Sequence, residues 1–376
     1  MSRVVIIGGG IVGLSVARAA LKVGKEVVLL EQGPVGNPNG ASYDNHRMIR
    51  YHYGAAEGYT RMVTDAFVAW DRIWNDLGET HHDTTGAISI GLAEDDYAGM
   101  TLASFRNNRI AHEILDAAEI AELCPHLKVP RSAWGLLSRV GGPLYASRIV
   151  DGLARWTRDH GAEIRANTNV ASVDLDAATA TLDNGQTIKG DHLVVAAGAW
   201  LPSLLPDLYA DLTTYRQALC YVEPPAQFAE SWRTAPSIVT IGDGVGYTLP
   251  DLRGAGLKFG AGSHRRLAAP SAGFSSDIAE ADYIISQFAP YLHDADSYRP
   301  LRMKVGYYVM DATRKFRLDS HGPSLVVTNC DGQMFKFGPL LGEAIVKMFE
   351  GRLSAQALRL WAAGDAAIAP KAAVNA

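Results

Sequence analysis

The sequence predicts a mixed α/β protein in which a parallel sheet is assembled from separated stretches of the chain and an antiparallel sheet is inserted between them. Residues 4–7 and 325–328 are short apolar runs rich in β-branched side chains, as in parallel strands buried on both faces. Residues 212–318 instead contain alternating segments separated by turns such as Asp243-Gly244, which is typical of antiparallel strands.

The first 31 residues contain a strand, a glycine motif and a helix in immediate succession. Residues 4–7 lead into G-x-G-x-x-G, residues 11–23 have helical spacing, and the apolar run 27–30 ends in Glu31, about 20 residues beyond the glycines. Glycines let the backbone approach a pyrophosphate, a helix N-terminus offers N–H groups, and an acid at this point can bind a ribose hydroxyl. The motif consists of Gly8, Gly9, Gly10, Ile11, Val12 and Gly13. We therefore predict a Rossmann-like dinucleotide-binding unit.

Two other interpretations of this stretch compete with that prediction. A glycine-rich turn in another kind of α/β protein is one, but here the motif lies between a strand and a helix, with an acid following. A secretory signal is the other, because Arg3, an apolar stretch and residues 17–19 imitate its three regions. Cleavage after residue 19 would remove the first strand and the glycine motif, with which the second strand and Glu31 form the nucleotide-binding pattern. We therefore reject the signal peptide.

The composition is that of an ordinary soluble globular protein, with 48% hydrophobic and 20% charged residues among 376, enough for two domains. A net charge of −5 gives no reason to expect nucleic acid or an anionic membrane as a partner. Three scattered cysteines, Cys124, Cys220 and Cys330, indicate no disulfide framework, and no C-x-x-C or H-E-x-x-H motif indicates a metal site. A reducing, cytoplasmic setting fits these features best.

Periodic patterns predict most of the remaining elements. An i, i+3, i+4 stripe predicts an amphipathic helix over residues 59–77 that ends at Gly78, with Trp70 and Trp74 in the core. The other predicted helices are a short one that a capping box at Asp116 and Glu119 begins and Pro125 stops, and three at residues 147–160, 276–288 and 343–349. The predicted strands lie at residues 87–92, 191–195, 218–222, 247–249 and 257–259.

Three further stretches have features of ligand sites. Residues 44–53 concentrate basic and aromatic side chains without a helical or strand period, which fits either a functional loop or a solvated charged loop. The strand at 191–195 ends in small residues that let a bulky ligand lie against backbone, although a strand without a ligand has the same pattern. The strand at 325–328 is followed by Gly332 and by glycines that border the last helix, so a second helix N-terminus can face an electron-rich ligand.

Five motifs follow one another in a specific order. They are Gly8 to Gly13 with Glu31; Arg47-Met48-Ile49-Arg50 followed by Tyr53; Tyr215-Arg216-Gln217; residues 256–260; and Phe335-Lys336-Phe337. Over nearly the whole chain this order resembles the flavoprotein family of D-amino-acid oxidase, glycine oxidase and monomeric sarcosine oxidase, and most of all sarcosine oxidase and N-methyltryptophan oxidase. The resemblance implies FAD and an α/β fold with an α+β substrate domain: residues 1–82, 144–212 and 313–376 bind FAD, and residues 83–143 and 213–312 form the inserted antiparallel-sheet substrate domain.

The resemblance also implies roles for individual residues. The cofactor-binding set would be Gly8, Gly10, Ile11, Val12, Gly13, Glu31, Arg47, Val170, Gly198, Gly306, Gly332 and Lys336. Arg50 and Lys336 would bind the substrate carboxylate, and Tyr247 and Tyr308 would line the substrate pocket. Lys258 would lie over the flavin face where oxygen reacts, and Arg47 beside the ring system. Lys258, Arg47, Tyr247 and Tyr308 would thus form the catalytic set.

Physical chemistry supports the charged roles with unequal strength. An arginine such as Arg50 gives a carboxylate two parallel charge-assisted hydrogen bonds, although a structural ion pair is the alternative. Lys258 lies among glycines that permit close approach of a flat ring, and a fixed cation there would stabilise superoxide. A solvent-facing lysine on an edge strand is the alternative for Lys258.

Three departures from the family pattern concern the cofactor link and the substrate. Sarcosine oxidases attach FAD covalently through a cysteine whose place is taken here by Gly306, and no cysteine lies nearby, so we predict dissociable FAD. A histidine pair is replaced by residues 43–45, and a histidine after the strand lysine is replaced by Gly262. The last change would make room for a bulkier amine than sarcosine.

The leading hypothesis is therefore an FAD-dependent oxidase of an amino acid, specifically of a secondary, N-substituted amine. Hydride transfer to flavin would leave an imine, and oxygen would be reduced to hydrogen peroxide. The alternative is an FAD-dependent dehydrogenase of a D-amino acid, opine or hydroxy acid with another electron acceptor. A flavin-binding subunit without turnover and a nicotinamide enzyme are more remote. The partners expected are the amine and oxygen, with the chain a monomer or small homo-oligomer.

Overall fold

A computed structural model describes residues 2–367. Strand β1 (Arg3–Ile7), helix α1 (Ile11–Lys22) and strand β2 (Glu26–Leu30) form the predicted unit at the centre of a six-stranded sheet. The strand order is β19-β20-β12-β1-β2-β8, and all neighbours are parallel except β19 and β20. The other strands of this sheet are β8 (Glu163–Arg165), β12 (His192–Val195), β19 (Arg317–His321) and β20 (Ser324–Thr328).

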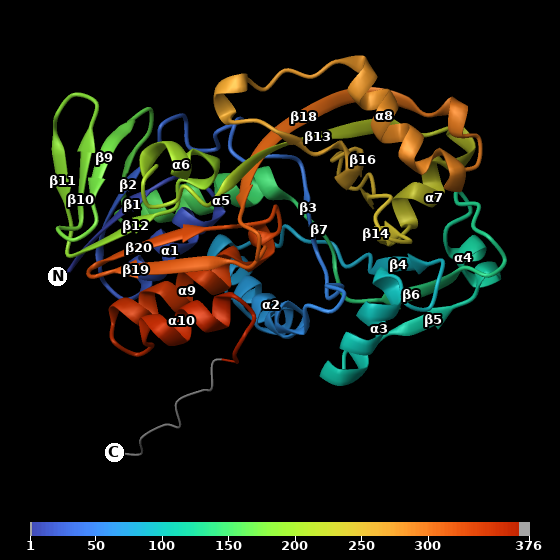
Figure 1. Cartoon of the computed structure of the whole chain (residues 1–376), viewed down its shortest axis with the longest axis horizontal. Coiled ribbons are helices and arrows are strands. Elements are labelled where there is room, and N and C mark those ends of the chain that lie inside the picture. Colours follow the sequence, from blue (N-terminus) through green and yellow to red (C-terminus); the bar gives the residue numbers. More distant parts are fainter. Residues whose placement is uncertain (1, 368–376) are drawn as a thin grey trace.

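Both faces of this sheet are covered (Figure 1). Successive side chains of a strand point to opposite faces, so Val4 and Ile6 enter one core, whereas Val5 and Ile7 enter another. Side chains of five helices join the first core: α1, α2 (Glu57–Leu77), α5 (Ala146–Asp159), α9 (Gly338–Phe349) and α10 (Ala355–Ala362). The second core lies under a three-stranded sheet and a short helix, namely β9 (Val170–Asp174), β10 (Thr179–Leu182), β11 (Thr187–Lys189) and α6 (Leu201–Leu204).

Helix α9 begins at Gly338, five residues before the predicted start, so Gly338 borders the helix as predicted but Gly342 lies within it. Both glycines face α1. A Cβ atom at Gly342 would lie 2.5 Å from the carbonyl carbon of Ser15, and one at Gly338 would lie 2.5 Å from Cγ1 of Ile11. The glycines are therefore required by close contact between the two helices, and not by a turn.

The region between residues 212 and 318 contains the predicted antiparallel sheet, built on two long strands. Strand β13 (Thr213–Glu223) pairs with β18 (Arg299–Met310) along nearly its whole length, and both run from the six-stranded sheet toward helix α8 (Ile278–Phe288) (Figure 1). The remaining strands are β15 (Tyr247–Leu249), β16 (Leu257–Gly260) and β17 (Arg266–Leu267). The hydrophobic cluster beneath this sheet includes Phe259 and Phe288.

A four-stranded sheet of order β14-β4-β6-β5 lies in the same half of the molecule. Strand β4 (Ala87–Gly91) is fully buried rather than alternating, because β14 (Ser237–Ile241) and β6 (Trp134–Ser138) flank it and its faces are covered. The other elements here are α3 (Tyr97–Asn108), β5 (Glu113–Leu115), α4 (Ala117–Leu123) and α7 (Ala229–Thr234). Helix α4 begins with the predicted capping box between Asp116 and Glu119.

The segment 44–53 contains a short strand that its sequence pattern did not indicate. Strand β3 (Arg47–Ile49) pairs with β7 (Gly142–Leu144), so the backbone of Arg47 is held in a ladder, and Arg50 directly follows its last pair. The 3₁₀ turns are η1 (Gly198–Trp200), η2 (Ala226–Phe228), η3 (Gly262–His264), η4 (Pro270–Ala272), η5 (Ala289–Tyr291), η6 (Ala295–Ser297) and η7 (Met334–Phe337).

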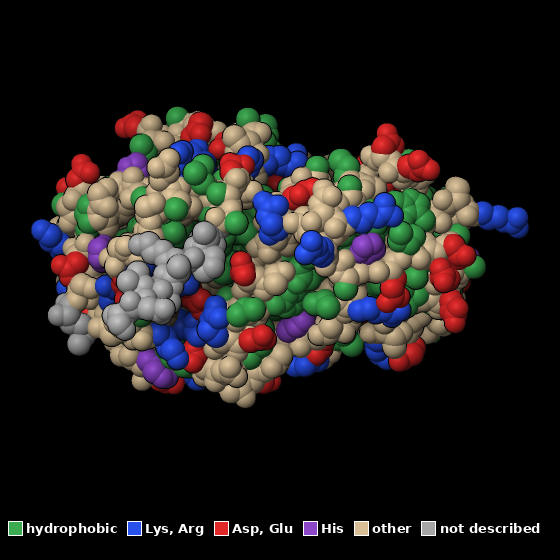
Figure 2. Space-filling view, turned by 90° about the horizontal axis from the view of Figure 1, so that it is seen from below, with side chains coloured by type: hydrophobic (Ala, Val, Ile, Leu, Met, Phe, Trp, Pro, Cys, Tyr) green, Lys and Arg blue, Asp and Glu red, His purple; other side chains and the backbone are tan. Residues whose placement is uncertain are grey.

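The surface of the molecule carries charges of both signs, which are interspersed over the face shown in Figure 2. Within residues 2–367, none of the helices combines the length and the apolar character that a membrane span requires. The same residues hold no cluster of three or more side chains arranged to bind a metal ion. Residues 368–376, which the predicted C-terminal domain segment includes, lie outside the described residues.

Candidate active site

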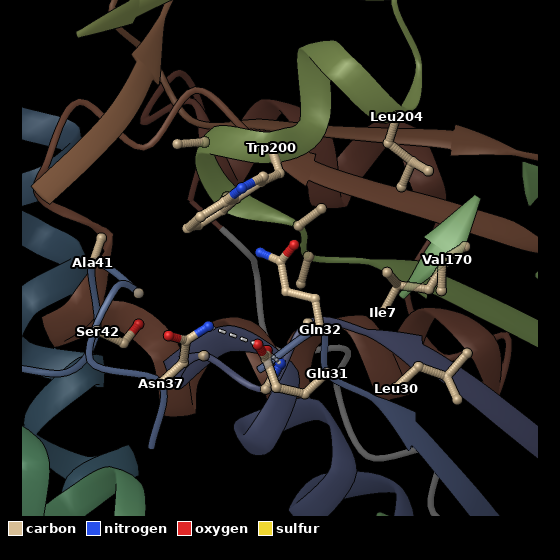
Figure 3. A pocket seen from close by; sticks show the side chains of 18 of the residues that line it. Ile7, Leu30, Glu31, Gln32, Asn37, Ala41, Ser42, Val170, Trp200 and Leu204 are labelled. Atoms are coloured by element: carbon tan, nitrogen blue, oxygen red, sulfur yellow. Dashed lines mark hydrogen bonds between the residues drawn. The ribbon is translucent and has the colours of Figure 1, made fainter. Parts of the chain in front are cut away.

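A cavity of about 360 Å³ opens at the carboxyl ends of β1 and β2, the edge at which parallel sheets bind nucleotides (Figure 3). Gly8, Gly9 and Gly10 line it. The motif needs glycine for steric reasons: a Cβ at Gly8 would lie 2.3 Å from the carbonyl oxygen of Ala196, and one at Gly13 would lie 1.9 Å from that of Gly8. The predicted close approach of bare backbone is therefore present, with the N-terminus of α1 beside it.

Glu31 lies at the end of β2 and lines the same cavity, as its spacing predicted. The carboxylate is buried and already accepts three hydrogen bonds: from Gly9 N at 2.7 Å, Gly33 N at 3.0 Å and Asn37 Nδ2 at 3.0 Å. Figure 3 shows the contact with Asn37. Glu31 thus holds the glycine loop in place, and its remaining lone pairs can still accept a hydrogen bond from a ribose hydroxyl.

Val170 and Gly198 also line this cavity, from β9 and from the turn after β12. Gly198 has a φ of +57°, and among the described residues no atom lies within 4 Å of a Cβ built there, so the wall is open at this point. Trp200 lines the cavity too, and its ring stands over the space between Gln32 and Ala41 in Figure 3. Sequence reasoning missed Trp200, although its position directly after the small residues was a usable signal.

A second cavity of about 200 Å³ adjoins the first and shares Gly10, Ser42 and Gly198 with it. Predicted site residues from distant parts of the chain line this space: Ile11, Val12, Arg47, Tyr247, Gly306, Tyr308 and Gly332. A Cβ added to Gly306 would meet no atom within 4 Å in the part of the chain that the structure describes. Strand β18 therefore presents bare backbone to an open space at Gly306.

The expectation that no cysteine lies near Gly306 is wrong. Cys330 follows β20 of the six-stranded sheet and lines the same second cavity as Gly306 of β18, because this cavity lies between the two sheets. Burial raises the pKa of the Cys330 thiol, so the thiol is protonated and a weak nucleophile at neutral pH.

A third cavity, of about 280 Å³, is continuous in lining with the second through Arg47, Tyr247 and Tyr308. Arg50 and Lys336 both face it. Arg50 stacks over the ring of Tyr53 at 4.6 Å, and its nitrogens lie 3.5 Å from Tyr97 Oη and 3.3 Å from Gln333 Oε1. The ion-pair alternative for Arg50 is wrong, because no carboxylate oxygen in residues 2–367 lies within 4.0 Å of its guanidinium.

Lys336 lies on η7, close to Arg50, and is only 5% exposed. Its Nζ donates to the carbonyl oxygen of Gln333 at 3.1 Å and lies 5.4 Å from the ring centre of Tyr53. Burial, together with the neighbouring Arg50, holds the pKa of Lys336 well below its usual range. The site therefore favours an anion here, because a bound carboxylate would compensate both cations.

Lys258, which we expect over the flavin face, is enclosed by the antiparallel sheet. It is fully buried in β16, between β15 and β13, and it is not among the residues that line the second and third cavities. Its Nζ lies 2.8 Å from Asp44 Oδ2 and also bonds the carbonyl oxygen of His46. The alternative of a solvent-facing edge lysine is therefore wrong. Burial lowers the pKa of Lys258 to about 7, although Asp44 opposes this shift.

Arg47 lines both the second and the third cavity. Its guanidinium donates to the carbonyl oxygens of Ala41 at 2.6 Å and His46 at 3.1 Å, and it also contacts Asp44. Burial raises the pKa of the neighbouring Tyr247 to about 12, and Arg47 opposes that rise. Tyr247 is therefore a neutral phenol that can donate a hydrogen bond into the cavity.

The glycine loop, the acid at the end of β2 and the adjoining cavity with an open wall at Gly306 define a dinucleotide-binding protein. The two cavities are continuous in lining, and their open points at Gly198 and Gly306 fit an FAD molecule laid from the first to the second. Residues 3–348 match the DAO family, described as FAD dependent oxidoreductase, and the chain belongs to this family. The predicted family and fold class are thereby confirmed.

Individual relatives have activities of related kinds. The chain is 26% identical over 359 residues to peroxisomal sarcosine oxidase of Homo sapiens, covering 92% of this chain and 91% of that protein. It is 24% identical over 366 residues to N-methyl-L-tryptophan oxidase of Salmonella enteritidis PT4, covering 93% and 95%.

Solved structures show the same fold. Amadoriase I of Aspergillus fumigatus, a fructosyl amine:oxygen oxidoreductase, has a TM-score of 0.78 at 18% identity, over 94% of this chain and 88% of that chain. NikD, described as an unusual amino acid oxidase, has a TM-score of 0.77 at 22% identity, over 94% and 96%.

Proposed function

We propose that this FAD-dependent oxidoreductase oxidises an N-substituted amino acid and reduces oxygen to hydrogen peroxide. The observation that carries this proposal is a pair of basic side chains without acidic partners, Arg50 and Lys336. They line the third cavity, which adjoins the second cavity that contains Gly306. A substrate carboxylate held there would place the adjoining amine toward the second cavity. The relatives that act on sarcosine and N-methyl-L-tryptophan support the same substrate class.

Most of the residues that would hold FAD line the first two cavities, and Gly13 packs directly against Gly8. Gly8, Gly10 and Gly13 with the start of α1 would receive the pyrophosphate, Glu31 the ribose, and Val170 the adenine, while Gly306, Gly332 and Arg47 would border the ring system. Bound FAD would supply the redox step, accepting a hydride equivalent from the carbon beside nitrogen to leave an imine, with the electrons passed on to oxygen. Residues 1–82, 144–212 and 313–376 would form this FAD-binding part, and residues 83–143 and 213–312 the substrate part.

The side chains of the third cavity would orient the substrate. Arg50 would give the carboxylate two parallel hydrogen bonds, and Lys336 would add a charge that the bound anion stabilises. Tyr247 and Tyr308 would line the pocket on either side of the amine. Among the described residues nothing lies within 4 Å of a Cβ at Gly262, which leaves room for an amine substituent larger than methyl.

Oxygen activation would depend on positive charge beneath the ring system. Arg47 faces the second cavity directly, whereas Lys258 would act from within the buried network that includes Asp44. The ion pair between Lys258 and Asp44 also favours the alternative function, because it partly cancels the charge that would stabilise superoxide. A dehydrogenase that uses another electron acceptor is therefore the second candidate.

Anaerobic mixing with N-substituted amino acids, followed by exposure to air, tests the proposal. Bleaching of the flavin absorption by such amines, and rapid recovery in air with formation of hydrogen peroxide, is the expected result. Bleaching with slow recovery would support the dehydrogenase. Arg50→Leu should raise the KM for the amine by about 100-fold or more, because one charge-assisted pair is lost. An unchanged KM would remove Arg50 from the substrate site.

We further propose that FAD is held without a covalent bond. The glycine at position 306 and the raised pKa of the Cys330 thiol support this proposal. Acid precipitation of the yellow protein should leave FAD in the supernatant. Colour that stays in the pellet would contradict the proposal, and loss of that colour in Cys330→Ser would then identify Cys330 as the point of attachment.

A further inference from the structure

The third cavity is lined by more basic side chains than one substrate carboxylate can contact. Five cationic side chains line it, namely Arg47, Arg50, Arg265, Arg314 and Lys336. Two of them are paired within the protein, Arg47 with Asp44 and Arg314 with Asp331 at 3.0 Å. For the other three, no carboxylate oxygen in residues 2–367 lies within the 4.0 Å of an ion pair. Arg50 and Lys336 account for the first carboxylate, so Arg265 remains without an acidic partner.

Arg265 is held at the exposed end of this cavity by its surroundings. It directly precedes β17, whose pairing with β13 places Leu267 opposite Tyr215. The guanidinium stacks over the Tyr215 ring at 4.7 Å, and the Tyr215 ring in turn stacks on that of Tyr308, with 6.0 Å between the centroids. Burial raises the pKa of the Tyr308 hydroxyl, and Arg265 opposes this rise, so the guanidinium lies beside a phenol of the cavity wall.

The neighbouring Arg266 differs from Arg265, because it forms an ion pair within the protein. Arg266 lies on β17, is exposed like Arg265, and points to Glu280, with 3.3 Å between Nη1 and Oε1. Arg266 is not among the residues that line the cavity. Two neighbouring arginines therefore differ in direction, one neutralised by the protein and the other facing the substrate space.

We propose that Arg265 forms a second anion-binding subsite, and that the substrate is an N-substituted amino acid with a second carboxylate or phosphate group remote from the first. This inference rests on the proposed function, since Arg50 and Lys336 must hold the first carboxylate. A guanidinium binds either anion through two parallel N–H donors. The open space at Gly262, which also lines this cavity, accommodates the chain that connects the two anionic groups.

Binding of unreactive acids to the FAD-loaded protein tests this subsite without turnover. The probes are propionate and the dicarboxylates succinate, glutarate and adipate, titrated while the visible flavin spectrum is recorded. The best dicarboxylate should bind at least about tenfold more tightly than propionate. Arg265→Met should remove that advantage and leave propionate binding within about twofold of wild type. Arg266→Met is the matched control and should change neither affinity.

The following results would support or overturn the anion-binding subsite at Arg265. A preference for dicarboxylates that persists in Arg265→Met, or is absent from the wild type, overturns the subsite. Binding of 3-phosphonopropionate about tenfold tighter than glutarate, lost in Arg265→Met, supports the subsite with phosphate as the second group. Turnover separates this inference from the proposed function: bleaching by N-methylglycine and N-methylaspartate with equal kcat/KM overturns the subsite alone. Failure of every N-substituted amino acid to bleach the flavin overturns the proposed function itself.

Discussion

Asp44 is the residue on which the charge buried beside the cavities depends. Its side chain is 1% exposed, and its two oxygens bind Lys258 Nζ at 2.8 Å and Tyr221 Oη at 2.5 Å, with Arg47 as a third partner. Although burial acts to raise it, Lys258 and Arg47 hold the pKa of Asp44 well below its usual range. Asp44 is therefore ionised near neutral pH, and it sets how much of the positive charge of Lys258 is felt outside the network.

Replacement of Asp44 by Asn keeps the shape of the side chain and removes its charge. Burial, Arg47 and Arg302 lower the pKa of Lys258, and Asp44 is the charge that opposes them, so the pKa of about 7 should fall further in Asp44→Asn. If the Lys258 ammonium assists oxygen reduction, the pH above which reoxidation slows should move down by at least about one unit. Stopped-flow reoxidation of the reduced holoenzyme across neutral pH measures this shift.

Tyr221→Phe is the control for that substitution, because it removes a hydrogen bond to Asp44 but no charge. Its pH profile should match wild type. An unchanged profile in Asp44→Asn as well would show that Lys258 does not titrate in the oxygen reaction.

Residues of the nucleotide motif were predictable because their spacing is local. The glycines and Glu31 fall within 31 residues, and chemistry fixes their order along one strand, helix and strand. The contact between Asp44 and Lys258 was not predictable, since 214 residues separate them. Each side chain taken alone could equally be a charged residue exposed to solvent. The approach of Cys330 to Gly306 was missed for the same reason, because it follows from sheet topology and not from sequence distance.

Packing between α1 and α9 carries a prediction for the cofactor site. In Gly342→Ala the new Cβ would lie 2.5 Å from the backbone of Ser15, which neither helix can avoid without moving. Overpacking of this kind costs about 1–3 kcal/mol of the free energy of unfolding. Because α1 begins at the glycine motif, its displacement should also weaken FAD binding. Urea denaturation and FAD titration measure the two effects.

Lys347→Ala on the exposed face of α9 is the matched control, with an expected change within about 0.5 kcal/mol. Wild-type stability of Gly342→Ala would show that the helix contact tolerates a methyl group, and that the glycine is not required there.

Glu280 joins helix α8 to strand β13 and to η3. Its oxygens accept hydrogen bonds from Arg216 at 2.7 and 2.9 Å and from His264 at 3.0 Å. The bonds from Arg216, aided by His264 and opposed by burial, lower the pKa of Glu280 from its ordinary 4.5 to about 2. A carboxylate with a depressed pKa contributes stability above its unfolded pKa and loses it as the pH falls through the folded pKa.

Glu280→Gln should therefore destabilise the protein by about 3 kcal/mol at neutral pH, and the difference from wild type should shrink below about pH 4 and vanish near pH 2. Denaturation at a series of pH values measures it. Glu230→Gln, in an exposed pair with Arg233 at 3.4 Å, serves as the control and should cost less than about 1 kcal/mol. A constant difference at all pH values would assign the effect to packing rather than to charge.

Elements with a strong period were predictable, and those shaped by their neighbours were not. Helix α2 has an apolar stripe and a terminal glycine, Gly78, in the left-handed conformation, so its bounds follow from the sequence. The start of α9 does not, because Gly338 and Gly342 look like helix breakers until α1 is placed against them. Strand β3 is three residues long, and its hydrogen bonds go to β7, which lies far along the chain.

At the scale of the whole molecule, the long strands β13 and β18 connect the two halves of the fold. Val309 of β18 packs into a core beside the six-stranded sheet, whereas Val305 and Tyr307 pack into the core of the antiparallel sheet. One strand thus contributes to both cores within five residues. Because β18 is continuous between the two cores, the strand that leads the chain back to the nucleotide-binding sheet also lines the second cavity.

A ligand laid across both halves should stabilise the whole fold. The first two cavities are lined by the glycine motif on one side and by β18 residues such as Gly306 and Tyr307 on the other. A ligand that binds only the native state adds about 2.7 kcal/mol at a hundredfold excess over its Kd, which for a chain of 376 residues corresponds to a rise of about 3 °C in Tm. Protein stripped of FAD should therefore unfold at a lower temperature, and added FAD should restore the Tm in a concentration-dependent manner. NAD at the same concentrations is the control, because it shares the adenosine and pyrophosphate but lacks the flavin ring system that we propose for the second cavity. A full shift with NAD would refute the assignment of the second cavity to the flavin, and no shift with FAD would refute the cofactor site as a whole.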